Sequence, residues 1–572
     1  MKWEYYTNPG FNSLSISSEL QISNFLTTLL VNRGFNNIEK IKEFLYPELN
    51  NFRDPFDFEN MEKVVEKIIE VKNRNGKIFI YGDYDVDGIT AAVFLTHSLK
   101  NIGVLVDYYI PNRSEEDYGL DRKNLDYMYS CGAELVITVD TSINSIEDIR
   151  YGRSLGIDVI ITDHHKSAKE TEDDEILYIN PKLSSKYGFK YLSGAGVALK
   201  VAQALYTKLN INLNSLHDYL DIVMIGTVAD VVPVVDENRL IIREGLKKLK
   251  TTNIKGLTAL IKYLKLHHRP LSATDISYFI APLINSLGRI GISRVGADFF
   301  IKNDDIKIFN IIEDMKKSNK TRRELERKIY EEAVSIIEMD PSKFKSAIFL
   351  TSKNWHPGII GIVASRLCMK YEVPTVLVSI DNNIGKASSR SLNGINIFNI
   401  FKNMSHLLSR FGGHDLAAGF VAKDSNLDEI NNFFQKEVSN SNIVEVERSL
   451  KIDMDFSIDQ ISNSILEDLD LLSPFGFDNS QPIFVDRNLT FENIKKFGLD
   501  NKHFSGIVVK NNKKFHMVGF DLGKYIDDDN YPLQKFDIAY YPEKNFFKNE
   551  NSIQIKIKDL RIKDDFLDFF HN

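Results

Sequence analysis

Short apolar runs alternate with amphipathic stretches between about residues 60 and 180. The runs are KIFIYG (77–82), VLVDYYI (104–110), ELVITVD (134–140), DVIIT (158–162) and ILYIN (176–180), and the stretches between them have helical spacing. Mostly apolar runs of this kind are typical of strands that are buried on both faces. The alternation predicts an α/β lobe built on a doubly wound parallel sheet.

Three further patterns follow along the chain. Residues 194–302 are helical in pattern, and 304–338 are rich in Lys, Glu, Arg and Ile without Gly or Pro, which predicts a long connecting helix. A second, smaller α/β pattern runs from SAIFL to about 440 and includes a helix near 396–410. The remainder is strand-rich, and HFSGIVV and FHMVGFD flank the turn-like KNNKK, which predicts a hairpin in a small β-barrel.

We therefore expect a chain of several domains, as its 572 residues also suggest. The boundaries that the patterns favour are an N-terminal segment at 1–50, a catalytic lobe at 51–303, the connecting helix at 304–340, a second lobe at 341–442 and a barrel at 443–572.

Composition excludes several classes of protein. No apolar run is long enough to span a bilayer, and the start has no secretory pattern, so we expect a cytoplasmic protein with no membrane partner. Neither Cys131 nor Cys368 belongs to a CxxC or Cys/His spacing, which disfavours a zinc site. A net charge of −8 argues against a protein that coats nucleic acid by bulk charge, but it leaves a nuclease with a local basic groove open.

Acids and histidines follow three of the predicted strands directly. The motifs are GDYDVDG (82–88), VDTS (139–142) and ITDHHK (161–166), with GTVADVVP (226–233) as a fourth. Parallel sheets bind ligands at the carboxyl ends of their strands. If the strands are neighbours, one crevice collects Asp83, Asp85, Asp87, Asp140, Asp163, His164 and His165.

So many anionic groups need cations, because like charges at short range otherwise retain one another's protons. The sequence thus predicts a binuclear centre, and mixed carboxylate and imidazole ligands suit Mn²⁺, with Mg²⁺ as an alternative. Asp85 and Asp87 would share one side of extended backbone before a helix that opens at Gly88.

The four motifs, in this order, resemble those of the DHH phosphoesterase family. INSLGRI, WHPGIIGIVASRL, KASSRS and FGGHDLAAGF resemble the DHH-associated domain with its GGH motif, and LLSPFGFDNSQPIF with the strand-rich tail resembles members that carry an OB-like barrel. One departure is visible, because the second motif usually has Gly where this chain has Ser142.

The resemblance implies a role for each motif residue. Asp140 would bridge two metals, with Asp83 and Asp85 on one ion and with Asp87, His164 and Asp230 on the other. Asp163 would orient a neighbouring histidine, and His165 would face the scissile phosphate.

Cations opposite the metals must neutralise the phosphate, and the candidates are Arg113, Arg289, Arg390 and His414. Gly412 and Gly413 would let backbone approach a phosphate closely. The resemblance implies that Arg113, Ser388 and Arg390 bind a terminal 5′ phosphate. In the tail, Phe504, Phe515 and Phe520 beside Lys510, Lys513 and Lys514 either stack bases or form barrel core with a solvated hairpin tip.

The resemblance implies an exonuclease that degrades single-stranded DNA from its 5′ end to mononucleotides by two-metal hydrolysis, in repair and recombination. A phosphodiesterase for short oligonucleotides or cyclic dinucleotides is the first alternative, and an inactive single-strand-binding relative is the second. A helicase and a single-strand-binding protein are the protein partners to consider, and a monomer is expected.

Overall fold

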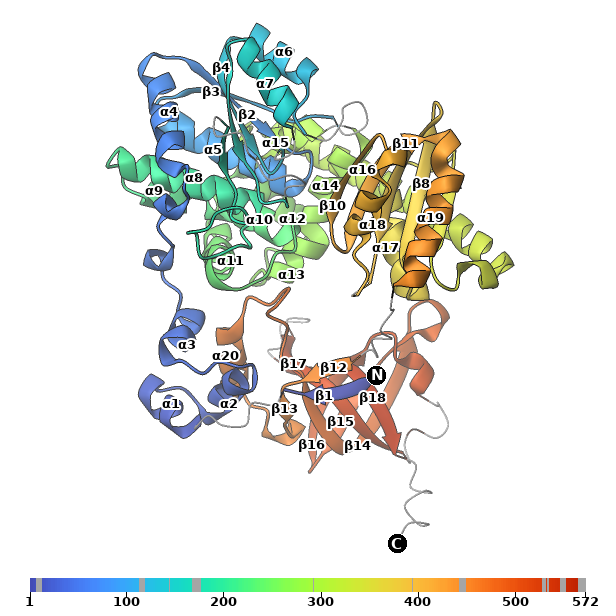
Figure 1. Ribbon diagram of the computed structural model, residues 1–572. Coiled ribbons are helices and arrows are strands. Elements are labelled where there is room, and N and C mark those ends of the chain that lie inside the picture. Colours follow the sequence, from blue (N-terminus) through green and yellow to red (C-terminus); the bar gives the residue numbers. More distant parts are fainter. Residues whose placement is uncertain are drawn as a thin grey trace. The chain divides into compact units, whose positions relative to one another are not determined.

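The computed structural model divides the chain into two compact units. One unit combines residues 1–52 with 446–572, and the other comprises 53–445 (Figure 1). The described residues are 1–6, 13–112, 119–142, 145–166, 176–291, 293–392, 394–441, 449–526, 531, 534–545 and 552–563.

The first lobe of the larger unit is built on a five-stranded parallel sheet, as the apolar runs predict. The strand order is β3-β2-β4-β5-β6, with β2 at Lys77–Gly82, β3 at Leu105–Tyr109, β4 at Ala133–Val139, β5 at Asp158–Thr162 and β6 at Leu177–Ile179. The helices α6 (Arg122–Ser130) and α7 (Ile146–Ser154) share one core with the sheet. The helices α4 (Met61–Asn73), α5 (Val86–Asn101) and α8 (Gly194–Lys208) contact its strands as well, so the sheet is doubly wound (Figure 1).

Helices follow from α8 to the end of this lobe. They are α9 (Asn214–His217), α10 (Leu220–Ala229), α11 (Asp236–Leu249), α12 (Lys255–Tyr263), α13 (Ala273–Asp275), the π-helix η3 (Ile276–Ile280), α14 (Ala281–Ile290) and α15 (Ser293–Ile301). The connecting helix α16 then spans Asp305–Met339, where the composition predicts it. Asp304 caps this helix, because its side chain accepts hydrogen bonds from the backbone N–H groups of Ile306 and Lys307.

The second lobe contains a mixed five-stranded sheet in the order β10-β11-β9-β8-β7. Its strands are β7 (Ile348–Ser352), β8 (Thr375–Asp381), β9 (Ile384–Arg390), β10 (Arg410–His414) and β11 (Ala417–Lys423). The helix α17 (Ile360–Tyr371) shares one core with α16, whereas α18 (Ile397–Asn403) and α19 (Leu427–Asn440) share another. The helix predicted near 396–410 is therefore too long, since Arg410 already begins the strand that carries FGGH.

The smaller unit is a closed five-stranded barrel with helices around it. Its strands are β14 (Phe484–Phe497), β15 (His503–Lys510), β16 (Lys513–Gly519), β17 (Lys535–Asn545) and β18 (Ser552–Lys563), and β14 pairs with both β15 and β17 to close the sheet. The helices α1 (Ser13–Leu20), α2 (Asn24–Asn32), α3 (Ile38–Leu45) and α20 (Asn463–Leu472) contribute to the barrel core, and β1 (Lys2–Tyr5) pairs with β12 (Ser449–Ile452). The N-terminal residues, for which the sequence predicts no chemistry, therefore complete the barrel unit.

The β15–β16 hairpin forms as predicted, but its aromatic and basic residues do not form one track. Phe504 is fully buried in the barrel core. Lys510 pairs with Asp486, and Lys514 lies 2.7 Å from Glu492. Phe520 is 53% exposed, so it alone of the three phenylalanines presents most of a ring to solvent.

Among the described residues, no helix combines the length and the apolar character needed to cross a bilayer.

Phe504 in the hairpin and Phe520 just after it should contribute very differently to the stability of the barrel. We expect Phe504→Ala to cost about 3–5 kcal/mol of barrel stability, because it removes a fully buried ring. Phe520→Ala should change stability by less than about 0.5 kcal/mol, since most of its ring is exposed. Urea unfolding measures the free energy of unfolding of each variant, and hydrogen exchange in β14–β18 shows whether a loss lies in the barrel. Equal losses in the two variants would contradict this assignment.

Candidate active site

The acid- and histidine-bearing motifs meet at the carboxyl edge of the parallel sheet. Asp83 follows β2, Asp140 follows β4 and Asp163 follows β5, and these three strands are direct neighbours. The sheet ladder continues into the motifs, because Asp140 N donates to Thr162 O at 3.0 Å and Asp163 N donates to Ile179 O at 3.0 Å. The backbone of the site is therefore as rigid as the sheet that carries it.

Asp85 and Asp87 differ in geometry from the extended pair that their spacing suggests. The helix α5 begins at Val86 and not at Gly88, and Asp85 is its N-cap. One Asp85 oxygen accepts hydrogen bonds from Asp87 N at 3.0 Å and Gly88 N at 3.1 Å. Asp87 lies in the first helical turn, where its carboxylate accepts from Gly194 N and Ala195 N at the start of α8. Two helix N-termini thus hold these two carboxylates in place.

Asp230 joins the site from a helix end and not from a strand. It is the C-cap of α10, and its Oδ2 lies 3.5 Å from His164 Nε2. Gly226 in the same motif allows α10 to approach α5, because a Cβ there would lie 2.6 Å from Asp87 Oδ1.

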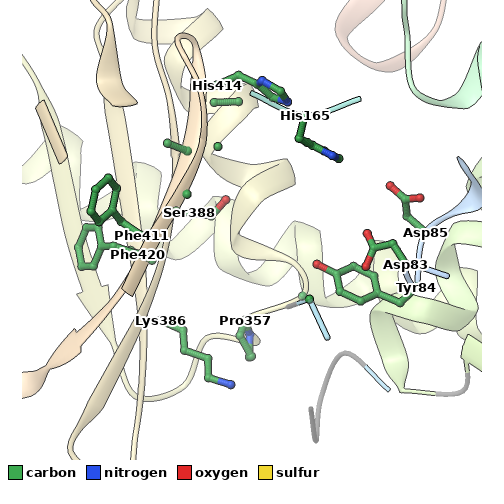
Figure 2. A pocket seen from close by; sticks show the side chains of 18 of the residues that line it. Asp83, Tyr84, Asp85, His165, Pro357, Lys386, Ser388, Phe411, His414 and Phe420 are labelled. Carbon is green, nitrogen blue, oxygen red and sulfur yellow. The ribbon is translucent and has the colours of Figure 1, made fainter. Parts of the chain in front are cut away.

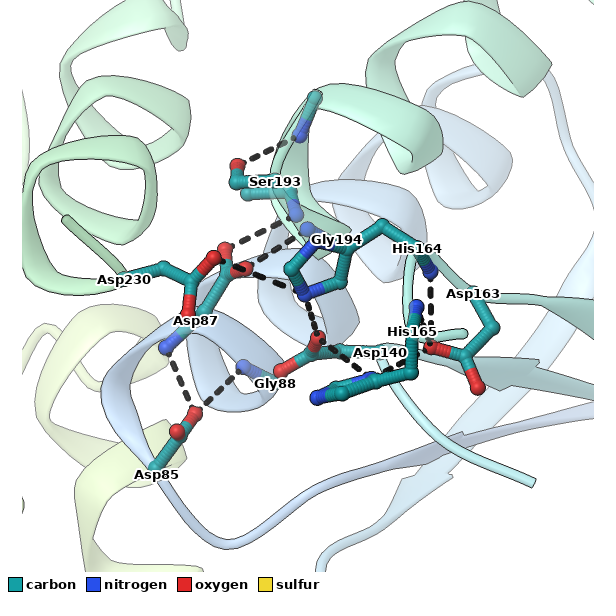
Figure 3. A network of polar contacts seen from close by, with 12 residues as sticks. Asp85, Asp87, Gly88, Asp140, Asp163, His164, His165, Ser193, Gly194 and Asp230 are labelled. Carbon is teal, nitrogen blue, oxygen red and sulfur yellow. Dashed lines mark hydrogen bonds and ion pairs between the residues drawn. The ribbon is translucent and has the colours of Figure 1, made fainter. Parts of the chain in front are cut away.

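The ligand atoms form overlapping groups in which each residue offers one atom within 4.8 Å of the others. The groups are Asp83, Asp85 and Asp140; Asp87, His164 and Asp230; and Asp140, His164 and His165. Figure 3 labels these residues except Asp83. The first two groups correspond to the two ligand sets that the sequence resemblance implies, and the third places Asp140 next to both histidines. The geometry therefore accommodates two adjacent divalent cations with Asp140 at the junction.

The charges of this cluster are unbalanced without cations. Burial and, next, the charge of Asp85 raise the pKa of Asp87 to about 7. Burial, followed by the neighbouring carboxylates, raises the pKa of Asp140 and Asp230 well above the usual range of an aspartate. Burial and the charge of His165 lower the pKa of His164 far below its usual range, which leaves a neutral imidazole fit to bind a metal.

Two buried atoms at the centre have no hydrogen-bond partner among the described residues. They are Asp140 Oδ1 and His164 Nε2, which lie 3.1 Å apart. Buried polar atoms are normally satisfied, so this pair supports a ligand between or beside them. Carboxylate and imidazole donors fit Mn²⁺ well and admit Mg²⁺.

Asp163 organises both histidines of its motif. Its Oδ1 accepts from His164 N at 2.7 Å and from His165 N at 3.1 Å, and it lies 2.7 Å from His165 Nδ1. Burial alone would raise the pKa of Asp163, but the charge and hydrogen bond of His165 outweigh it and lower the pKa to about 2. At His165, burial alone would lower the pKa, but the charge and hydrogen bond of Asp163 outweigh it and raise the pKa to about 9. Asp163 thus fixes the orientation of the His165 ring.

Ser142 occupies a backbone position that favours glycine. Its φ is 79°, in the left-handed region, and Asp140 nearby has a φ of 62°. The buried Ser142 side chain compensates in part, because its oxygen accepts a hydrogen bond from Leu120 N at 3.1 Å. Ser142 is the motif position at which the sequence resemblance leads us to expect Gly.

A cavity of about 620 Å³ separates the metal-binding residues from the second lobe (Figure 2). Asp83, Asp85 and His165 line one wall, and β9, β10 and β11 line the other. His165 and His414 stack across the cavity with ring centroids 5.3 Å apart. Burial and, next, the charge of His165 lower the pKa of His414 to about 4.

All but one of the substrate-binding residues predicted from the sequence line this cavity. They are Arg289, Ser388, Arg390, Gly412, Gly413 and His414. Arg289 donates to Gly358 O at 2.9 Å, which connects α14 to the loop before α17. Arg113 lies outside the described residues.

The cavity also contains residues that sequence reasoning missed. Lys386 precedes Ser388 and Arg390 on the same face of β9, and Arg410 precedes Gly412 and His414 on β10. In a strand, every second residue lies on the same face. Assigning KASSR and RFGGH as strands would therefore have indicated Lys386 and Arg410 as cavity residues. Lys166 and Asp415 form an exposed ion pair between the two lobes at 3.0 Å, and Tyr84 and Asn285 also line the cavity.

Comparison with known proteins identifies the parts of the chain. Residues 77–227 match the DHH family N-terminal domain, 344–440 match the DHHA1 domain, and 452–559 match the RecJ OB domain. These matches and the acid–histidine edge of the sheet define a phosphoesterase of the DHH class.

Whole-chain relatives narrow the assignment. The chain is 31% identical over 570 residues to the single-stranded-DNA-specific exonuclease RecJ of Bacillus subtilis, which covers 99% of this chain and 71% of that protein. It is 30% identical to RecJ of Haemophilus influenzae, over 70% of this chain and 73% of that protein. The chain belongs to the RecJ family.

Solved structures agree with this fold. RecJ from Thermus thermophilus in complex with Mn²⁺ matches with a TM-score of 0.82 at 23% identity, covering 98% of this chain and 80% of that one. An exonuclease RecJ bound to manganese matches with a TM-score of 0.58 at 27% identity, covering 68% of this chain and 97% of that one.

The two glycines of the FGGH strand should respond differently to alanine. Gly413 has a φ of 135°, and a Cβ there would lie 2.5 Å from Ala417 O, so Gly413→Ala should cost about 1–3 kcal/mol and distort the wall. A Cβ on Gly412 meets nothing within 4 Å, so Gly412→Ala should fold normally and raise KM by narrowing the cavity. Thermal unfolding and steady-state kinetics separate the two effects. Normal stability of the Gly413→Ala protein would contradict this account.

Proposed function

We propose that this chain is a metal-dependent exonuclease that hydrolyses single-stranded DNA from its 5′ end and releases mononucleotides in repair and recombination. The observation that carries the proposal is the pair of ligand groups that meet at Asp140 on one wall of a cavity whose other wall carries Ser388, Arg390 and His414. The printed names of the relatives, single-stranded-DNA-specific exonucleases, support the same activity, and they do not favour the two alternatives drawn from the sequence.

Mn²⁺ or Mg²⁺ is the cofactor that the donor set fits, held by Asp83, Asp85, Asp87, Asp140, His164 and Asp230. When bound, two such ions supply a water of lowered pKa and hold the attacking and leaving oxygens of an in-line displacement at phosphorus. The chain itself then needs no side-chain nucleophile.

The protein's own part is to hold the phosphate and neutralise its charge. His165, which Asp163 orients, faces the cavity where the scissile phosphate would lie, and His414 stacks on it from the second lobe. Arg289 and Arg390 provide permanent positive charge along the same cavity. Cations placed in advance around a phosphate stabilise its transition state at no cost in reorganisation.

The end of the strand would be anchored by Ser388 and Arg390, together with Arg113. Lys386 extends this row by one more cation, since alternate residues on a strand are roughly 6.8 Å apart. A fixed site for the terminal phosphate makes cleavage exonucleolytic, because the end must bind before the next phosphodiester reaches the metals. The cavity volume of about 620 Å³ is in the range of small-ligand pockets, which favours a single strand over a duplex.

The expected assembly belongs to the same proposal. Both walls of the cavity come from one compact unit of one chain, which supports activity as a monomer. The cytoplasm is proposed as its compartment. Single-stranded DNA is the substrate partner, and a helicase and a single-strand-binding protein are proposed as protein partners.

Removal of Asp140 should abolish turnover. We expect Asp140→Ala to lower kcat by at least about a thousandfold, since Asp140 would be a ligand shared by both ions and metal catalysis contributes several kcal/mol. Mn²⁺ titration by calorimetry should show weaker binding, whereas anisotropy of a labelled strand in EDTA should be unchanged.

Asp218→Ala is the matched control, because Asp218 is an exposed acid that pairs with Lys248 away from the cavity. Without metal, the Asp140→Ala protein should melt no lower than the native one, since the substitution removes one member of a cluster of mutually repelling buried carboxylates. Native turnover by the Asp140→Ala protein would exclude the bridging role.

Arg390 should set the preference for phosphorylated ends. We expect Arg390→Ala to lower kcat/KM on a 5′-phosphorylated strand about 10- to 100-fold, the worth of a hydrogen bond to a charged group, and to change hydrolysis of a 5′-hydroxyl strand little. Lys370→Ala, an exposed cation on α17, is the control. An equal loss on both ends would place Arg390 at the scissile phosphate, and activity on dinucleotides alone would contradict the proposed function.

A further inference from the structure

A second groove lies on the larger unit outside the catalytic cavity. It has a volume of about 480 Å³ and is lined by the end of α12, the π-helix η3, the start of α14 and one face of α16. None of the motifs discussed above contributes to its lining, and the proposed chemistry does not use it.

Three large aromatic side chains are exposed in this groove. Tyr278 is 71% exposed, Phe279 47% and Tyr263 41%. Tyr278 and Phe279 are adjacent on η3, a π-helix, and helical segments of this kind are rare and frequently occur at functional sites. Aromatic faces left in solvent together are suited to stacking against flat, unpaired rings.

The opposite side of the groove is basic. Lys316, Lys320, Arg323 and Arg327 line it from α16, and Glu324 is the one acid among its lining residues. Their spacing of four, three and four residues places the four cations on one face of the helix. Lys316, Lys320 and Arg327 form ion pairs along α16 with Glu313, Glu324 and Glu331, respectively. Four cations against three acids leave this side of the groove modestly positive in a chain whose net charge is −8, so the groove favours an anionic ligand.

The groove and the catalytic cavity share the helix α14. Pro282 and Leu283 at its start line the groove, whereas Asn285, Gly288 and Arg289 line the cavity. Leu283 and Gly288 are about 7.5 Å apart along the helix axis. The groove and the cavity are therefore neighbours along one helix.

We propose that this groove binds the part of a single-stranded nucleic acid that extends beyond the catalytic cavity. Bases stack on Tyr263, Tyr278 and Phe279, and the phosphates meet the cationic face of α16. The proposal deepens the proposed function and rests on it for the identity of the ligand. Base–aromatic stacking combined with a positive groove is the general mode of sequence-independent single-strand binding.

The test compares strand lengths in the full chain. Binding of a long oligo(dT) strand, labelled at its 3′ end and measured by anisotropy in EDTA, should weaken about tenfold or more in the Tyr278→Ala/Phe279→Ala protein. KM for the long strand should rise similarly, while kinetic constants for a dinucleotide stay native. Tyr278→Phe should retain native binding because the ring remains.

A second variant probes the charges without touching the aromatic residues. Lys320→Glu/Arg323→Glu should weaken binding of the long strand and make the plot of log affinity against log salt shallower by about 0.7 for each lost phosphate contact. Tyr129→Ala is the matched control for the aromatic variant, since Tyr129 is 53% exposed on α6 and lies outside both cavities.

The outcomes are distinct. Native binding of the long strand by both variants overturns the proposal, as does an equal loss for the long strand and the dinucleotide. Loss of binding to an acidic peptide with native strand binding would assign the groove to a protein partner instead. Because binding is measured in EDTA, failure of the native protein to cleave any strand would sink the proposed function without deciding the role of the groove.

Discussion

Carboxylates that cannot all be ionised together are the constraint on which this structure depends. The parallel sheet brings Asp83, Asp140 and Asp163 to adjacent strand ends, and two helix N-termini hold Asp85 and Asp87 beside them. Burial strengthens the repulsion among these groups, so they retain protons more tightly than ordinary aspartates when no cation is bound. Bound cations would let the carboxylates ionise together, which is the physical basis of the affinity for metal that we expect.

The second lobe forms the cavity wall opposite the metal-binding residues, where a phosphate would have to bind without a large loss of solvation. Its sheet presents small residues, Ser388 on β9 and Gly412 on β10. Along the same strands lie the cations Lys386, Arg390 and Arg410. The backbone at Gly413 has a conformation that a side chain would strain, which keeps this wall open next to His414. Metal ions bound on one wall would face the fixed cations of the other wall, so a phosphate in the cavity would meet positive charge on both sides.

The sequence alone predicted the parts of the site that depend on local order. Apolar runs that end in Asp or His indicated the sheet and its ligand edge, because parallel strands leave no choice about where their carboxyl ends lie. It misplaced Asp85 and Asp87 on extended backbone, since the capping of α5 by Asp85 depends on where the helix begins. It missed Lys386 and Arg410 because their strands were not assigned residue by residue. Phe504 was ambiguous, because a strand residue faces core or solvent according to register, which only the closed barrel fixes.

The groove on α16 could not have been predicted in this way, because its parts have no common motif. Tyr263, Tyr278 and the cations of α16 come from three helices, and each alone is an ordinary surface residue. Their juxtaposition indicates a function because α14 lines the groove with its first residues and the catalytic cavity with its last. If the end of a strand is released and rebound after each proposed cleavage step, the proposed terminal phosphate site is empty during that interval. A stacking surface one and a half helical turns away keeps the remaining strand at high local concentration, because rebinding is then intramolecular. A chain of net negative charge can in this way retain an anionic polymer by local contacts, although its overall field repels it.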